Sequence, residues 1–398
     1  MYLLGPVVQP YAWGSRYAIA EMQGRPVPSP GPEAELWMGA HPSAPSVLER
    51  GGHHTTLDAV VASDPTGELG SECVDRFGPR LPFLLKVLAA GKALSIQVHP
   101  DRAQAEAGFR SENRLGVAPS DPTRNYVDDW PKPEILCALT PFEALAGFRA
   151  PAEAAEIVGE LSLSVLRPLI ATLRAGEDPA VLTEALRQVV TWPDDDRVAV
   201  LDEVVAACTR LAAEGGRYAP AYDAAVRIAA DHPGDAGVLA SLLLRHVVLE
   251  PGEALFMPAG GLHAYIKGIG VELLANSDNV LRAGLTGKHM DVPELLRIVD
   301  PTVAVPVVHP EPVYEHVAVY RSAAPEFRLH RMTPAEEPVA VPAAGPRIVF
   351  CVEGETVLAD ATGAELTRPV SAWVAYVASV TCPRAFSPRR SYDFTAPT

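Results

Sequence analysis

The segment LSIQVHPD, residues 94–101, carries two side chains that could bind a metal ion within one short run. Apolar and polar residues alternate along it, and in a β-strand such alternation directs the two kinds of side chain to opposite faces. Gln97 and His99 would therefore share the polar face. Two interpretations fit this pattern: a surface strand whose polar face contacts water, or a strand that lines a β-barrel and presents both side chains to a metal.

A second segment, PGEALFMPAGGLHAY, contributes another histidine. Gly252, Pro258, Gly260 and His263 have the spacing G-x5-P-x-G-x2-H. This spacing resembles the second signature of the cupin superfamily, whose double-sheet jelly rolls hold a metal within a barrel. Taken alone, the segment also fits a hairpin with an incidental histidine. Together with LSIQVHPD upstream, it favours metal binding.

A third segment, DDWPKPEILCALT, supplies Lys132 and Glu134. Glu134 begins an apolar run, so its carboxylate is expected beside a core, where a charge is usually neutralised, paired or bound to metal. Gln97, His99, Glu134 and His263 together offer two nitrogen and two oxygen ligands. This set suits zinc better than magnesium or calcium, which prefer oxygen ligands alone.

The composition is that of an ordinary globular protein, with 48% hydrophobic and 21% charged residues among 398. The formal net charge of -16 argues against nucleic-acid binding, which needs basic residues to neutralise phosphates. An anionic ligand would instead need a local basic pocket. Only five of the 33 basic residues are lysines, and they fall into two short stretches: Lys86, Lys92, Lys132, Lys267 and Lys288.

The five cysteines are scattered and form no CxxC motif. This usage indicates reduced thiols and a cytoplasmic protein. The first residues, MYLLGPVVQP, lack the basic region of a signal peptide, and no run of about 18 apolar residues occurs. We therefore expect a monomer that binds neither nucleic acid nor a membrane.

The pattern of apolar residues changes three times along the chain. Residues 1–150 show short strand-like runs separated by Pro and Gly, and residues 151–243 show helical spacing. Strand patterns return over 244–304, apart from a predicted helix at 288–300, and continue over 305–398. The predicted fold is mainly β with a helical insertion: two cupin jelly-roll barrels plus an all-α domain.

Several stretches of the sequence resemble the type I phosphomannose isomerase family, and they span most of residues 10–300. They are YAWG (11–14), AELWMGAHPSAPS (34–46), LPFLLKVLAAGKALSIQVHPD (81–101), TPFEALAGFR (140–149) and VELLANSDNVLRAGLTGKHMDVPELL (271–296). The resemblance implies a zinc enzyme of the cupin superfamily with one zinc per chain. By their match to the family's motifs, the implied zinc ligands are Gln97, His99, Glu134 and His263.

The implied reaction interconverts mannose 6-phosphate and fructose 6-phosphate by moving a proton between C2 and C1 through an enediol. Such a site needs a phosphate anchor, a group that stabilises charge on the sugar oxygens, and an acid/base group. Arg282 matches the residue marked as catalytic in the family, and Lys132 is a further catalytic candidate. Glu272 and Asp278 are acid/base candidates. Glu272 is preferred because it sits within an apolar strand, whereas Asp278 fits a turn-forming residue equally well. The candidates for substrate binding are Ser95, Lys86, Lys288, Tyr265 and Trp13, although Tyr265 and Trp13 also fit a core.

The sequence departs from the family at one place near these residues. The family usually reads HKPE before the glutamate ligand, whereas this chain has Trp130-Pro131-Lys132-Pro133-Glu134. The change leaves one alternative open within the enzyme class, an isomerase for another sugar phosphate. A second alternative, from a different class, is a non-catalytic sugar-binding cupin. The predicted C-terminal barrel has no clustered ligand set, so we expect it to bind no metal.

Overall fold

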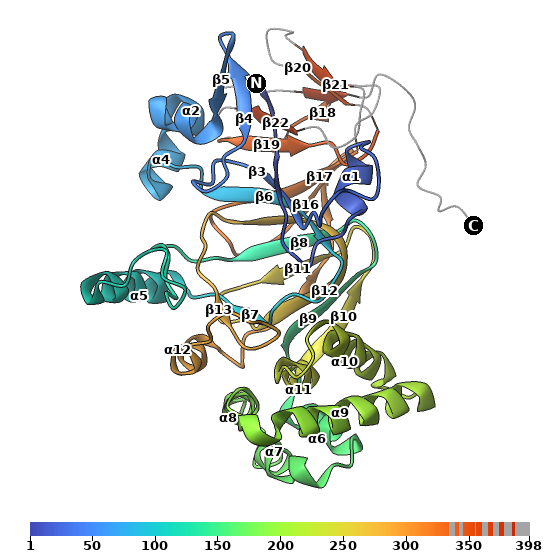
Figure 1. Ribbon diagram of the computed structural model, residues 1–398. Helices are drawn as coiled ribbons and strands as arrows, with labels where there is room; N and C mark the ends of the chain where they lie inside the picture. The colour runs from blue at the N-terminus through green and yellow to red at the C-terminus, as the bar shows by residue number, and fades with distance from the viewer. Residues whose placement is uncertain are drawn as a thin grey trace. The chain divides into compact units, whose positions relative to one another are not determined.

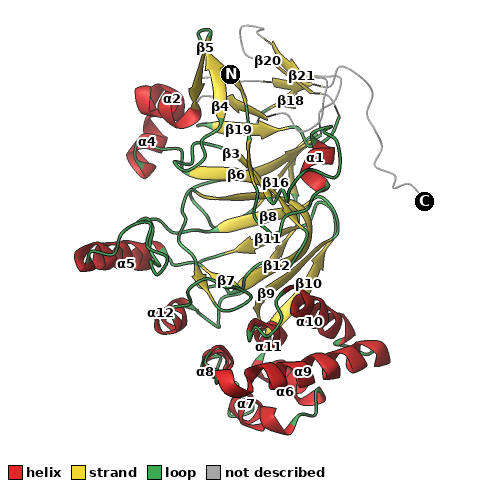
Figure 2. Ribbon diagram, in the orientation of Figure 1, coloured by secondary structure: helices red, strands yellow, loops and turns green. Residues whose placement is uncertain are grey.

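The computed structural model describes residues 1–333, 339–341, 345–354, 356–359, 365–368, 374–377 and 384–386. The chain forms two compact units, each built from segments distant in sequence. The first unit comprises Met1–Ala89, Val271–Asn276 and His309–Thr398, and the second comprises Ala90–Gly270 and Ser277–Val308. Both helices and strands are present, as Figure 2 shows. None of the described helices combines the length and apolar character needed to cross a membrane.

The second unit contains an antiparallel sheet whose strands come from both sides of the helical residues 151–243. β11 pairs with β8 and β14, β9 pairs with β10 and β12, and β7 lies between β12 and β13. The strands are β7 (Gln97–Val98), β8 (Glu134–Ala138), β9 (Phe142–Phe148), β10 (Leu244–Leu249), β11 (Ala254–Met257), β12 (His263–Ala275, of which Val271–Ala275 belong to the first unit), β13 (Leu281–Arg282) and β14 (Val307–Val308).

Every element between residues 151 and 243 is helical, and Figure 1 shows these helices gathered beside β9 and β10. They are α6 (Pro151–Glu160), η1 (Ser164–Leu166), α7 (Arg167–Leu173), α8 (Ala180–Val190), α9 (Asp194–Glu214), α10 (Ala219–Asp231) and α11 (Gly237–Leu243). In α8, Leu182, Ala185, Leu186 and Val189 are buried, and their spacing of three and four residues places them on one face. That face joins a core cluster shared with Ile96 and Val98 near the sheet.

Two further helices of the second unit are α5 (Arg102–Leu115) and α12 (Val292–Ile298). α5 follows LSIQVHPD directly, because Asp101 and Gln104 form a reciprocal capping box at its first turn. Gly116 ends it in the left-handed conformation, with φ of 75°. α12 falls within the helix predicted over 288–300, so that prediction is confirmed.

The N-terminal part of the first unit combines short strands and helices. β3 pairs with β2 and β6, and β4 pairs with β5. The elements are β1 (Tyr2–Leu4), β2 (Val7–Gln9), α1 (Ala18–Met22), β3 (Glu35–Met38), β4 (Val47–Arg50), β5 (His53–Thr56), α2 (Leu57–Ser63), α3 (Pro65–Leu69), α4 (Ser71–Phe77) and β6 (Phe83–Ala90, whose last residue belongs to the second unit). Trp37, Leu84 and Leu274 form a small buried cluster in this unit.

The described elements after residue 308 are all strands, and the predicted C-terminal barrel lies partly outside the described residues. β1 pairs with β22, which also pairs with β19, so the N-terminal strand belongs to a C-terminal sheet. The strands are β15 (Glu311–Tyr314), β16 (Val317–Tyr320), β17 (Leu329–Met332), β18 (Val339–Ala340), β19 (Arg347–Phe350), β20 (Thr356–Ala359), β21 (Glu365–Arg368), β22 (Val374–Val377) and β23 (Arg384–Phe386).

Candidate metal centre

The short strand β7 lies between β12 and β13, which place a histidine and an arginine on either side of it. Gln97 is paired with His263 of β12 on one side and with Arg282 of β13 on the other. Directly opposed residues of antiparallel strands project from the same face of a sheet. Gln97, His263 and Arg282 therefore form one row on one face. Ile96 and Val98 on the opposite face are fully buried, as the alternation in LSIQVHPD requires.

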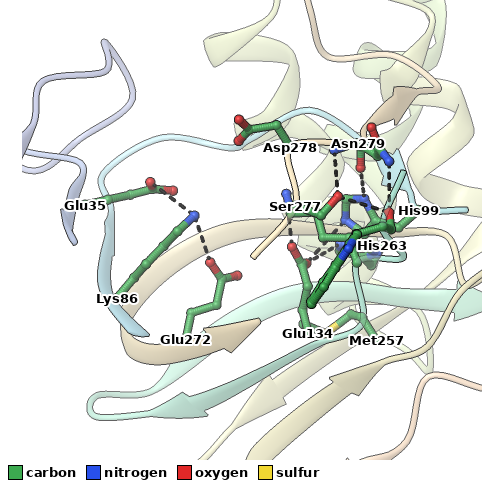
Figure 3. A network of polar contacts seen from close by, with 12 residues as sticks. Glu35, Lys86, His99, Glu134, Met257, His263, Glu272, Ser277, Asp278 and Asn279 are labelled. Carbon is green, nitrogen blue, oxygen red and sulfur yellow. Dashed lines mark hydrogen bonds and ion pairs between the residues drawn. The ribbon is translucent and has the colours of Figure 1, made fainter. Parts of the chain in front are cut away.

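His99, Glu134 and His263 converge beside this row, as Figure 3 shows. Glu134 Oε2 lies 3.3 Å from the Nε2 atom of each histidine. The three residues are 1%, 4% and 2% exposed, so water does not solvate the carboxylate well. Lys132 Nζ is 3.3 Å from the other carboxylate oxygen, Oε1. In the described part of the chain, this is the one group of His, Cys, Asp and Glu side chains with metal-binding spacing.

Backbone carbonyls fix the orientation of both histidine rings. His99 Nδ1 donates to the carbonyl oxygen of Asn279 at 2.8 Å, and His263 Nδ1 donates to that of Gly261 at 3.0 Å. A ring that donates through Nδ1 keeps a lone pair on Nε2 when it is neutral. Each Nε2 faces Glu134, and that of His99 is buried without a hydrogen-bond partner. Metal-binding histidines are commonly oriented in this way.

The protonation states also suit metal binding. Burial lowers the pKa of His99 to about 4, in opposition to the nearby Glu134 carboxylate, so the ring is neutral at pH 7. Burial acts to raise the pKa of Glu134, but its contacts with His99, Lys132 and His263 outweigh burial and hold that pKa well below its usual range. The cluster thus combines a neutral imidazole with a carboxylate ion, which are the forms that coordinate metals.

The distances from Glu134 to the two histidines fit a tetrahedral zinc site. Zinc bonds of about 2.0–2.1 Å to nitrogen and oxygen give ligand–ligand distances of about 3.3 Å in a tetrahedron. Both Glu134–histidine distances are 3.3 Å. The unpartnered Nε2 of His99 gives a second reason, because a buried polar atom without a partner is costly unless something binds it. Gln97, directly opposite His263, is available as a fourth, oxygen ligand.

Hydrogen bonds of Asp128 and Asn279 join two loops next to His99, one at residues 128–130 and the other at 277–279. The Asp128 carboxylate accepts hydrogen bonds from Trp130 N, Ser277 Oγ and Asp278 N at 2.8–2.9 Å. The Asn279 amide donates to the carbonyl oxygens of Asp128 and Trp130, at 2.8 and 2.9 Å. Asn279 is fully buried, and its own carbonyl orients His99. Sequence reasoning missed Asp128 and Asn279, whose only signal was their position inside DDWPKPE and NSDN.

Arg282 and Lys288 form a pair of neighbouring cations. Burial lowers the pKa of the half-buried Arg282, and burial together with the Arg282 charge lowers the pKa of Lys288. In the described part of the chain, neither cation forms an ion pair with a carboxylate. Two adjacent, unpaired cations favour binding of an anion such as phosphate.

The other predicted residues of the second unit have different surroundings. Ser95 is half-buried two residues before Gln97, and Asp278 is exposed, with its carboxylate pointing away from His99 in Figure 3. Tyr265 is buried; its ring packs edge-on against Phe142, with ring centroids 5.3 Å apart.

Three predicted residues, Trp13, Lys86 and Glu272, belong to the first unit. Lys86 Nζ lies 3.5 Å from a Glu35 carboxylate oxygen, 3.6 Å from one of Glu272, and 4.8 Å from the centre of a Trp37 ring. All three charged side chains of this network are buried. Trp13 is half-buried and packs against Tyr11.

Comparison with known proteins identifies close relatives over nearly the whole chain. Residues 1–151 match the family described as phosphomannose isomerase type I, catalytic domain. Mannose-6-phosphate isomerase of Escherichia coli is 39% identical over 360 residues, covering 88% of each chain, and mannose-6-phosphate isomerase 2 of Arabidopsis thaliana is 33% identical over 373 residues, covering 87% of this chain and 82% of the relative.

Solved structures agree with these sequence matches. A single-substitution variant of phosphomannose isomerase from Salmonella typhimurium superimposes with a TM-score of 0.90 at 33% identity, covering 97% of this chain and 96% of the other. A mannose 6-phosphate isomerase bound with zinc and yttrium gives a TM-score of 0.87 at 32% identity, covering 97% and 99%.

Proposed function

Because this chain belongs to the type I phosphomannose isomerase family, we propose that it is a zinc-dependent isomerase that interconverts mannose 6-phosphate and fructose 6-phosphate. The observation that carries this proposal is the buried cluster of His99, Glu134 and His263. Arg282 lies beside it, on the same face of the sheet as His263. A sugar-binding protein without catalytic activity would not need buried metal ligands next to an unpaired guanidinium.

His99, Glu134 and His263 would hold one zinc ion per chain, with Gln97 as the fourth ligand. When bound, zinc supplies a positive centre that polarises oxygen atoms of the open-chain sugar. The pairing of β7 with β12 supports this assignment, because it places Gln97 directly opposite His263. The carbonyls of Asn279 and Gly261 keep both imidazoles in the tautomer that presents Nε2.

The reaction removes the proton from C2 of the open-chain aldose and returns a proton to C1. Loss of the C2 proton gives an enediolate. The ketone forms at C2 when the O2 hydroxyl loses its proton and the former aldehyde oxygen O1 gains one, so that protons lost and gained balance. Arg282 would stabilise negative charge on O1 and O2, and Lys132 would add a second positive charge from the Glu134 side. Lys288 would bind the phosphate, with Ser95 and Tyr265 lining the sugar site.

Glu272 is the preferred candidate for the acid/base group that carries the proton. It is buried and lies 3.6 Å from Lys86, so its ionised form is stabilised by a neighbouring cation. Asp278 is the alternative, although it is exposed. Lys86 and Trp13 are proposed to contact the substrate.

We further propose two cupin jelly-roll barrels with an all-helical insertion. The proposed divisions are 1–150 and 244–304 for the catalytic barrel, 151–243 for the insertion, and 305–398 for a second barrel without metal. The run of helices from α6 to α11 and the strands on either side support this division. A monomer acting in the cytoplasm on a free sugar phosphate fits the acidic net charge and the free Cys73, Cys137, Cys208 and Cys351.

The test measures fructose 6-phosphate formation from mannose 6-phosphate before chelation, after chelation and after zinc is restored, with zinc content determined at each stage. We expect activity to disappear with the metal and to return with zinc. Zinc-loaded protein that is inactive on mannose 6-phosphate but isomerises another aldose phosphate would overturn the substrate assignment. Full activity in zinc-free protein would overturn the metal assignment.

A further inference from the structure

The segment 231–237, from the last residue of α10 through the following loop to the first residue of α11, forms hydrogen bonds with the backbone that connects Arg282 with Lys288. Asp235 Oδ1 accepts hydrogen bonds from Gly237 N at 2.7 Å and from Leu285 N at 2.8 Å. Its other oxygen, Oδ2, accepts one from Thr286 N at 3.0 Å. One carboxylate of the helical segment thus holds two consecutive amides that lie about 50 residues away in sequence.

The backbone of this connection needs such support. Leu285 has φ of +55°, a left-handed conformation that is strained for a non-glycine residue. Gly284, with φ of +130°, lies so close to α11 that a Cβ there would be 2.7 Å from Gly237 Cα. A Cβ on Gly237 would in turn lie 2.6 Å from Leu285 N. The two backbones are in direct contact, and the Asp235 hydrogen bonds offset the strain at Leu285.

The same segment also holds the backbone that leads into β7. Asp231 Oδ2 accepts a hydrogen bond from Ala93 N at 3.0 Å, and His232 Nε2 donates to Ala93 O at 2.7 Å. Farther along, Ile96 exchanges backbone hydrogen bonds with Ala283 and Gly284. Segment 231–237 therefore forms hydrogen bonds with the backbone just before β7, at Ala93, and just after β13, at Leu285 and Thr286.

The connection fixes how far apart the two cations lie. Arg282 is held by the register of β13 with β7, and the Lys288 amide donates to Thr286 Oγ1 at 3.0 Å. Like charges repel, and the Arg282 charge already contributes to the lowered pKa of Lys288. Lys288 is exposed, so a loosely held connection would let it move away from Arg282, and the hydrogen bonds to Asp235 and Thr286 oppose that movement.

We propose that Asp235 is a positioning residue through which the helical segment holds Lys288, beside Arg282, in place for binding the substrate phosphate. This inference rests on the proposed function for the identity of the anion. It gives the helical segment a part in substrate binding although Asp235 itself touches no substrate.

The experiment compares zinc-loaded Asp235→Asn with wild type and with Asp202→Asn, a matched change at an exposed position of α9. The asparagine can still accept bonds at the Oδ1 position and so preserves the start of α11, but its NH2 group cannot accept from Thr286 N. Four readouts are needed: hydrogen exchange resolved at single amides over residues 281–290, calorimetric affinity for inorganic phosphate, KM and kcat for mannose 6-phosphate, and zinc content.

For Asp235→Asn we expect faster exchange at Thr286 and unchanged zinc content. The phosphate dissociation constant and KM should rise together by roughly 3- to 10-fold, the effect of losing about one hydrogen bond, with kcat within about twofold. Thr286→Val, which keeps the amide bonded to Asp235 but removes the acceptor for Lys288 N, should weaken phosphate binding without changing exchange at Leu285. Asp202→Asn should match wild type in every readout.

Unchanged phosphate affinity in both Asp235→Asn and Thr286→Val would overturn the proposal, and so would loss of zinc in parallel with phosphate. If wild-type protein fails to isomerise mannose 6-phosphate, the proposed function fails. The exchange and phosphate measurements then still decide whether Asp235 positions the anion site.

Discussion

Arg282 lies directly opposite Gln97 in the pairing of β13 with β7, and Gln97 is in turn opposite His263. A permanently charged guanidinium and a proposed zinc ligand thus occupy neighbouring positions of one sheet row. Because strand pairing fixes their separation, the cation and the metal site cannot move independently. This relationship allows the contributions of charge and metal to be tested separately.

Arg282→Ala should leave zinc content and thermal stability close to wild type, since Arg282 forms no ion pair in the described part of the chain. Turnover should fall by about 10²–10³-fold, the usual effect of removing a group that stabilises developing charge. Steady-state kinetics with zinc analysis would measure both effects. The control is Arg110→Ala on α5, an exposed arginine. Near-normal turnover would remove Arg282 from the site.

His263→Ala should lose zinc and isomerase activity together. His263 contributes one of the two imidazole nitrogens among the four proposed ligands, so its loss leaves His99 as the one nitrogen ligand of the set and weakens zinc binding. Metal content after dialysis and activity in added zinc would be measured, with His53→Ala, an exposed strand residue, as the control. Full activity in metal-free His263→Ala protein would contradict the zinc assignment.

Asp128→Asn should weaken zinc binding although Asp128 is not a ligand. Its carboxylate accepts hydrogen bonds from the 277–278 segment next to Asn279, which orients His99. Loss of groups that support metal ligands typically costs about 10- to 100-fold in metal affinity. Competition with a chromogenic chelator would measure the affinity, and Asp202→Asn would be the control. An affinity equal to that of wild type would show that the two loops are held by other contacts.

Glu143→Gln should make the stability of the second unit less dependent on pH. Burial acts to raise the pKa of Glu143, but hydrogen bonds from His246 and Arg227 outweigh it and lower the pKa to about 2. A carboxyl with a pKa below its unfolded value of 4.5 stabilises the fold above pH 4.5, and this contribution is lost as pH falls from there toward 2. Wild type should therefore exceed the variant by on the order of 1–3 kcal/mol at pH 7, with the difference shrinking in acid.

Urea unfolding of wild type and variant at several pH values would measure this difference. Glu184→Gln is the matched control: the pKa of Glu184 is also lowered to about 2, by hydrogen bonds from Arg187 and Gln188, but its side chain is 43% exposed. Surface pairs contribute little, so this control should behave like wild type. A pH-independent difference for Glu143→Gln would exclude the carboxylate charge as its cause.

Lys86→Met should destabilise the first unit by about 3 kcal/mol, because it removes the cation between two buried carboxylates. Lys92→Met, at an exposed position, is the control, and both would be compared by urea unfolding. Stability equal to that of wild type would mean that Glu35 and Glu272 do not depend on the Lys86 charge in the folded protein.

Local patterns in the sequence were sufficient to predict which side chains are buried, where neighbouring residues in the same strand or helix determine this. The alternation in LSIQVHPD predicted the buried positions of Ile96 and Val98, and helical spacing predicted the buried face of α8. Glu134 at the start of an apolar run was expected beside a core, and it is 4% exposed. Periodicity succeeds in these cases because side-chain direction follows directly from backbone geometry.

The tertiary structure alone decided which segments meet. Nothing in the sequence indicated that β1 pairs with β22, or that Asp128 and Asp235 accept hydrogen bonds from residues 150 and 50 positions away. A hydrophobic pattern reveals which face of an element is buried, but it does not reveal the partner that covers that face. Strand register and loop-to-loop hydrogen bonds arise from the packing of the whole chain. The sequence therefore predicted the residues proposed to bind zinc, but not the strand pairs and hydrogen bonds that position them.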